Sequence, residues 1–146
     1  MRFQMIVDEE SEESVIATVH TPSTLTDKIE MLVLEYTGKD TVIGFTENGF
    51  TSLSFSMIEC VFVERGKTFA VLHDGSRYRL DLRLYEIEQR LPQSFLRINK
   101  SAIGNIHCVK SFQSTLSGAV DAHFLCGHVE YVSRRCLSSI KRSLSL

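Results

Sequence analysis

The stretch FLRINKSAIGN, residues 95–105, joins a strand-like beginning to a polar turn. It opens like a strand, with the apolar residues Phe95, Leu96 and Ile98 around Arg97. Lys100 and Ser101 then stand among small apolar residues. Three kinds of structure would explain polar groups there: a catalytic loop, a solvated turn, or a surface that recognises another molecule.

Around this stretch, the hydrophobic pattern repeats every two residues, which is typical of strands. From residue 41, apolar runs flank Asn48-Gly49 and Asp74-Gly75, the dipeptides of tight hairpins in which both central residues take positive φ. Between these hairpins the run MIECVFVE is apolar on both faces, which predicts a strand inside a sheet. A third hairpin is predicted at Cys126-Gly127. Residues 41–146 are therefore expected to form a mainly β body.

Short helices are predicted between and after these strands. The segment LRLYEIEQRLP should form one that ends before Pro92, because proline disfavours helix in the residue that precedes it. The final segment SRRCLSSIKRSLSL should form another, with Ser133 as its N-cap and an apolar stripe that includes Leu137 and Ile140.

The first forty residues are expected to form a separate, acidic extension of two strands and a helix. They hold three basic and nine acidic residues, a net charge of −6. The predicted strands are RFQMIVD and VIATVH, and the predicted helix covers residues 24–37, with Thr24 and Asp27 as a capping pair. In contrast, residues 91–146 hold seven basic and two acidic residues, a net charge of +5, which favours a phosphate-bearing partner.

Composition places the chain among cytosolic globular proteins. It has 146 residues, 43% of them hydrophobic and 23% charged, and no apolar run reaches the roughly 20 residues that cross a bilayer. The N-terminus turns acidic where a secretion signal would stay apolar. The four cysteines form no C-x-x-C pair and are expected to be reduced and mostly buried.

Enzyme and metal-site signatures are missing from the sequence. It contains no G-x-S-x-G, no phosphate-binding glycine loop and no H-E-x-x-H, and Glu86 and Glu88 lie two apart on a predicted helix, facing different directions. We therefore expect no enzyme activity, metal or cofactor. A redox or metal switch through Cys108, Cys126 and His128 is the alternative, although their spacing misses the usual zinc patterns.

Basic residues at the edges of the predicted elements favour nucleic-acid binding. Lys67 precedes a strand, Lys100 enters the turn of the opening stretch, and Arg134 and Arg135 lie in the first turn of the last helix. Each alone is most simply a solvated charge. Cations at a helix N-terminus, however, face the unfavourable end of the helix dipole, and a phosphate bound there would offset that cost.

The opening stretch resembles the central motif of the LytTR family of bacterial DNA-binding domains, F-x-R-x-H-R-S-x-x-x-N followed by an apolar strand. The motif positions are matched by Phe95, Arg97, Ser101 and Asn105. The preceding Asp-Gly hairpin and helix ending in Leu-Pro are also similar, as is the closing YVSRRCL. The resemblance covers residues 41–146, and residues 1–40 are similar to the extension of stand-alone members that lack a receiver domain.

The resemblance implies a fold of about ten mostly antiparallel strands in small sheets, with short helices. It also implies that loops between strands, entering the DNA major groove, recognise the sequence. Asn99 and Lys100 stand where the family usually has His and Arg, and we expect both to protrude. Gly104 replaces a larger apolar residue. The predicted DNA-contacting set is Lys67, Asn99, Lys100, Ser101, Arg134 and Arg135, while Phe95, Arg97 and Asn105 are expected to be structural.

These features together predict a sequence-specific transcriptional regulator that binds double-stranded DNA. The resemblance further implies a homodimer on tandem promoter sites and a small membrane-protein antagonist. The alternative is a protein-interaction module in which the acidic stretch or the helix at 24–37 docks on another protein.

Overall fold

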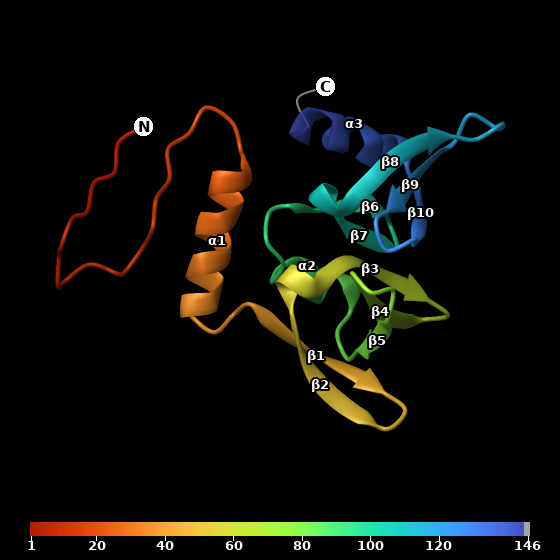
Figure 1. Cartoon of the computed structure of the whole chain (residues 1–146), viewed down its shortest axis with the longest axis horizontal. Coiled ribbons are helices and arrows are strands. Elements are labelled where there is room, and N and C mark those ends of the chain that lie inside the picture. The colour runs from red at the N-terminus through yellow and green to blue at the C-terminus, as the bar shows by residue number, and fades with distance from the viewer. Residues whose placement is uncertain (145–146) are drawn as a thin grey trace.

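A computed structural model describes residues 1–144 of the chain (Figure 1). It confirms a mainly β fold of ten strands with short helices. The elements, in chain order, are α1 (Thr24–Tyr36), β1 (Thr41–Thr46), β2 (Gly49–Ser54), the 3-10 helix η1 (Phe55–Met57), β3 (Ile58–Glu64), β4 (Lys67–Leu72), β5 (Arg77–Leu80), α2 (Leu84–Glu88), β6 (Phe95–Asn99), β7 (Ala102–Asn105), the 3-10 helix η2 (Ile106–Cys108), β8 (Val109–Ser114), β9 (Val120–Phe124), β10 (Val129–Val132) and α3 (Arg134–Ser143).

The strands form two antiparallel sheets. The larger sheet has the order β2-β1-β5-β4-β3-β7-β6, and the smaller one has the order β10-β9-β8. Strand β3 lies inside the larger sheet, between β4 and β7, and its residues 58–62 are all buried. The prediction of an interior strand with two apolar faces is thus confirmed.

The three predicted hairpins are present, but the turn geometry differs from the prediction. Gly75 has φ 84°, whereas Arg65 is the one non-glycine residue with positive φ among residues 1–144, so the first residue of each predicted pair stays at negative φ. Both central residues of the β3–β4 turn, Arg65 (φ 52°) and Gly66 (φ 76°), have positive φ. This is the backbone of a tight hairpin turn at a dipeptide that the sequence pattern did not mark.

The two sheets pack through Phe124 of β9, which contacts β7 at Gly104. A Cβ atom at position 104 would come within 2.5 Å of the Phe124 ring and 3.2 Å of Ile98. Gly104 pairs with Cys60 on one side and Leu96 on the other, so its backbone is held within the sheet. The glycine that departs from the family pattern therefore provides the space into which the second sheet packs.

The N-terminal extension differs from the prediction. Residues 1–23 contain no strand, and their side chains are exposed, so the two predicted strands were wrong. In Figure 1 this segment (red to orange) loops away from the body, and α1 stands beside the body. Helix α1 is confirmed, but its N-cap is Ser23, whose N–H donates to the Thr26 hydroxyl at 2.8 Å, not the predicted pair one residue later.

Helix α1 contacts the body through a small number of residues. Met31 and Leu34 pack against the core of the larger sheet. The carboxylate of Glu30 accepts the Gln93 N–H at 3.0 Å, and Asp27 contacts His107 Nε2 at 2.7 Å. Among residues 1–144, no helix is long and apolar enough to span a membrane.

Candidate nucleic-acid interface

The opening stretch forms a tight hairpin with Lys100 at its tip. Strands β6 and β7 pair from Phe95↔Asn105 to Asn99↔Ala102, which leaves Lys100 and Ser101 in the turn. Lys100 is exposed and Ser101 half-buried. The expected core positions are confirmed, since Phe95 is 8% exposed and Ile98 and Ile103 are fully buried. At the other end of the hairpin, Asn105 accepts the His107 N–H at 3.0 Å through Oδ1 and caps η2.

Asn99 does not protrude, so that part of the prediction was wrong. Its side chain is 5% exposed. Its Nδ2 donates to the carbonyl of Tyr131 at 2.7 Å and to Glu130 Oε2 at 3.3 Å, and its Oδ1 accepts the Ser101 N–H at 2.7 Å. A buried amide with partners for both of its ends is a structural residue, because leaving either end unpaired costs free energy. Asn99 therefore holds the turn that presents Lys100.

The β3–β4 turn lies next to this hairpin tip. Phe62 of β3 pairs with Ala102 of β7, and the Val63 N–H donates to the Ser101 carbonyl at 2.8 Å. Lys67, the first residue of β4, pairs with Glu64 across the tight turn and is exposed. The hydrogen bond from Val63 therefore holds Lys67 and Lys100 at the same end of neighbouring strands in the larger sheet.

The start of α3 lies beside the same hairpin. The Ser133 N–H donates to the Ile98 carbonyl at 3.0 Å, and the Ser133 hydroxyl accepts the Cys136 N–H at 3.2 Å, which confirms Ser133 as the N-cap. Arg134 and Arg135 are exposed in the first turn of α3, which contains no acidic residue. Three turns therefore meet at one edge, and we call them the three-turn edge: residues 64–67, 99–102 and 131–135.

Arg97 supports the β6–β7 turn, the middle one of the three-turn edge, through hydrogen bonds. Its Nε and Nη2 donate to the two carboxylate oxygens of Glu88 at 2.7 Å and 3.3 Å, and its Nη1 donates to the Lys100 carbonyl at 3.0 Å. These three hydrogen bonds use the planar guanidinium group of arginine, and the ammonium group of a lysine could not form the same set. The motif arginine thus binds the main chain of Lys100, whose side chain is exposed.

The exposed cations of the edge are available to a ligand. Among residues 1–144, no acidic side chain forms an ion pair with Lys67, Lys100, Arg134 or Arg135. Sequence reasoning missed one more cation there, Arg65, which is exposed in the β3–β4 turn. The Gly that follows it was the one available signal, since it permits a tight turn.

The alternative of a switch through Cys108, Cys126 and His128 does not match the arrangement of these side chains. His128 Nε2 lies 2.9 Å from Glu130 Oε1 and belongs to a group with Cys60, whereas Cys108 belongs to a separate group with Glu59 and His73. Burial raises the pKa of the Cys108 thiol to about 11, so the thiol is protonated and a poor nucleophile near neutral pH. Neither Glu59 nor His73 was singled out from the sequence.

The two carboxylates considered for catalysis have separate structural partners. Glu86 Oε1 accepts the Arg83 N–H at 3.0 Å at the start of α2, and Glu88 binds Arg97. They do not converge on a site, in agreement with the expectation from their spacing.

Comparisons with known proteins agree with this arrangement. The LytTr DNA-binding domain model matches residues 48–145. A LytTr DNA-binding domain of a putative methyl-accepting/DNA response regulator from Bacillus cereus superposes with a TM-score of 0.66 at 22% identity, over 73% of this chain and 98% of that one.

Full-length relatives are also similar. Two proteins described as uncharacterized HTH-type transcriptional regulators, from Staphylococcus aureus strains bovine RF122 / ET3-1 and NCTC 8325 / PS 47, are 29% and 28% identical over all of this chain and 99% of theirs. In residues 1–144 strands separate α1, α2 and α3, so no two helices form a helix-turn-helix. Because the family model covers most of the chain, from the first hairpin to the last helix, this protein belongs to the LytTR family of DNA-binding domains.

Proposed function

We propose that this protein regulates transcription by recognising duplex DNA sequence with its three-turn edge, inserting turns into the major groove in place of a recognition helix. The observation that carries the proposal is the hydrogen-bonded junction at Asn99 and Ser101, which holds the turns of Lys67, Lys100 and Arg135 together. A rigid frame with protruding cations meets the main requirement for binding DNA.

We assign two kinds of contact to these turns, contacts to base edges and contacts to backbone phosphates. Lys100 stands at a hairpin tip, where a side chain projects farthest and can reach guanine N7 or O6. Arg135 has a planar fork suited to two acceptors of one guanine. Arg134, with Ser101 and Lys67 flanking the tip, is assigned to backbone phosphates. Recognition at the tip therefore depends on lysine geometry, and its base preference need not follow relatives that carry arginine there.

Equilibrium binding to DNA selected from a random pool, at stated salt, tests the proposal. Lys100→Ala and Arg135→Ala should each weaken binding by about 1–3 kcal/mol and relax preference at one position, whereas Arg134→Ala should weaken all sequences alike and reduce the salt slope by ~1. The matched control is Lys28→Ala on α1, at the opposite end of the β6–β7 hairpin. Unchanged affinity in folded Lys100→Ala and Arg135→Ala would contradict the proposal.

Self-association through the N-terminal extension is a second part of the proposal. Helix α1 exposes Leu32 (64%) and Tyr36 (82%), and the preceding segment exposes Phe3 (89%) and Ile16 (86%). A second copy that covers these side chains would give a homodimer on tandem promoter sites. The same surface is where a protein partner, including a small membrane-protein antagonist, would compete. Because the target is promoter DNA, the proposed activity is cytosolic.

The mass of the free and DNA-bound protein in solution tests this second part. A dimer that Leu32→Glu and Tyr36→Glu convert to a folded monomer supports it. A monomer at all concentrations, free and on DNA with two half-sites, contradicts it.

A further inference from the structure

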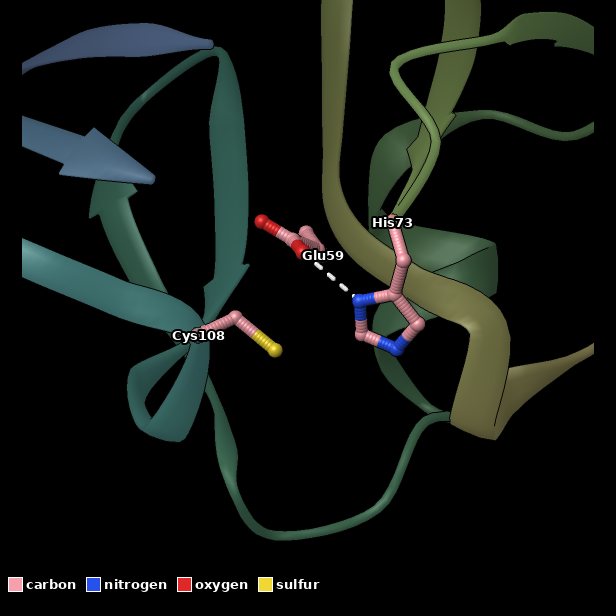
Figure 2. Close-up of side chains that lie close together, drawn as sticks. All are labelled: Glu59, His73 and Cys108. Carbon is pink, nitrogen blue, oxygen red and sulfur yellow. Dashed lines mark hydrogen bonds and ion pairs between the residues drawn. The ribbon is translucent and has the colours of Figure 1, made fainter. Parts of the chain in front are cut away.

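A buried carboxylate, a half-exposed imidazole and a buried thiol meet where the two sheets join, away from the three-turn edge. Figure 2 shows Glu59, His73 and Cys108 pointing toward one another. One oxygen, nitrogen and sulfur atom of the three all lie within 4.8 Å of each other. Glu59 is 1% exposed and stands at the bulge of β3, His73 follows β4, and Cys108 ends η2. Three separate segments thus contribute one potential ligand each.

The outer contacts of these side chains are those of metal ligands. His73 Nε2 lies 2.8 Å from the Ser56 carbonyl, which fixes the N–H on that nitrogen and directs Nδ1 into the cluster. Glu59 Oε1 accepts the Cys126 N–H at 2.9 Å, which leaves Oε2 directed at His73. Metal-binding histidines commonly donate their other N–H to a carbonyl, and ligating carboxylates are held by hydrogen bonds in the same way.

The contact between Glu59 and His73 lies where a metal ion would bind. Glu59 Oε2 and His73 Nδ1 are 2.6 Å apart, and His73 Nε2 faces the Ser56 carbonyl. The imidazole is half-exposed, with 51% of its side chain accessible, so an ion can enter from the solvent side.

We propose that Glu59 Oε2, His73 Nδ1 and Cys108 Sγ form a site for a divalent transition-metal ion of the Zn²⁺ class. A thiolate, an imidazole and a carboxylate suit this class and disfavour Mg²⁺ and Ca²⁺, which prefer oxygen alone. Binding displaces the proton on His73 Nδ1 and the proton on Cys108 Sγ to solvent, and a water molecule completes a tetrahedral set. Ligand atoms in such a set are separated by roughly 3.3–3.7 Å, which a rotation of the His73 ring provides.

The second cluster of this kind is a weaker site. Cys60 is fully buried, and its partners His128 and Glu130 are engaged elsewhere. The His128 ring stacks on Phe62 with centroids 4.5 Å apart, and Glu130 Oε2 accepts from Asn99. These commitments leave no side chain free to turn toward an ion, so Cys60 serves as an internal comparison.

Titration of the chelator-treated full chain with Co²⁺ tests the site, because a thiolate ligand gives cobalt a charge-transfer band. We expect one Co²⁺ per chain, displacement by Zn²⁺ and a metal-dependent rise in melting temperature. Cys108→Ser should abolish the charge-transfer band, and His73→Gln should weaken binding by at least tenfold. Cys136→Ser, which alters a thiol on α3 outside both clusters, should leave the titration unchanged.

Three results would overturn the proposal. The first is a parent protein that gives no charge-transfer band. The second is a band lost in Cys60→Ser and retained in Cys108→Ser, which would assign the ion to the other cluster. The third is equal binding by the parent and by both His73→Gln and Cys108→Ser, with circular dichroism showing that all are folded.

Discussion

The side-chain amide of Asn99 donates a hydrogen bond to the main-chain carbonyl of Tyr131 at 2.7 Å, across 32 positions of sequence. This bond joins the β6–β7 turn to the segment that leads into α3. Together with the Ser101–Val63 main-chain bond, it holds the three cationic turns in one arrangement. A residue at a position expected to recognise bases instead organises the turns that carry the proposed DNA-contacting cations.

Replacing Asn99 should therefore reduce stability, whereas replacing its neighbour should not. Asn99→Ala leaves the Ser101 N–H and the Tyr131 carbonyl without their partner, which should lower the free energy of unfolding by about 1–3 kcal/mol. Lys100→Ala, at an exposed tip, should stay within about 0.5 kcal/mol of the parent. Urea denaturation measures both. An Asn99→Ala protein as stable as the parent but impaired in DNA binding would mean that Asn99 contacts DNA directly.

Arg97→Lys should weaken DNA binding without a change in net charge. Lysine cannot engage both Glu88 oxygens and the Lys100 carbonyl at once. Loss of the bond to the turn should cost about 0.5–1.5 kcal/mol of affinity, roughly twofold to tenfold. Arg79→Lys, which alters an ion pair with Asp81 in the segment between β5 and α2, is the control. If Arg97→Lys and Arg79→Lys bound DNA with equal affinity, Arg97 would not contribute to the arrangement of the three-turn edge.

Gly104→Ala should destabilise the junction of the two sheets. The new methyl group would meet the Phe124 ring inside van der Waals contact, and overpacking of this kind costs about 1–3 kcal/mol. Phe124→Leu should itself destabilise but partly relieve the clash in the double variant. Thermal unfolding of the parent, the two single variants and the double variant gives the coupling free energy between positions 104 and 124. If the effects of the two substitutions on stability simply add, the two residues do not interact.

Removal of residues 1–23 and removal of residues 1–40 should have different effects. The first deletion removes exposed side chains and should leave the melting temperature nearly unchanged. The second also removes Met31, Leu34 and the Glu30 contact to Gln93, and should cost about 1–3 kcal/mol. Calorimetry of both truncated chains decides this. Equal stability of the two would show that α1 does not contribute to the core.

Local sequence signals correctly predicted the turns and helix ends that depend on a few neighbouring residues. The dipeptides Asn48-Gly49 and Asp74-Gly75 marked real hairpins, and Ser133 marked the start of α3, because turn and cap preferences act within a few residues. The strand-like segments RFQMIVD and VIATVH misled, since such a segment forms a strand only where another strand is available to pair with it.

The features that were missed depend on contacts distant in sequence. The burial of Asn99 depends on a carbonyl that no local pattern reveals, and the match to the family motif placed it among the DNA-contacting residues. Glu59 carried a usable signal, an acid in the interior of the apolar run MIECVFVE, which implies a buried partner. Its partner His73 could not be identified without the register of β3 and β4. Apart from Arg65, the exposed cations of the three-turn edge were found because they lie at element ends.

Amide hydrogen exchange of the full chain, free and bound to selected DNA, tests the central claim most directly. The account predicts slower exchange on binding at residues 64–67, 99–102 and 131–135 together, with the α1 region and the β1–β2 turn unaffected by the contact itself. Protection confined to α1 or the β1–β2 turn, with the three-turn edge unchanged, would contradict it.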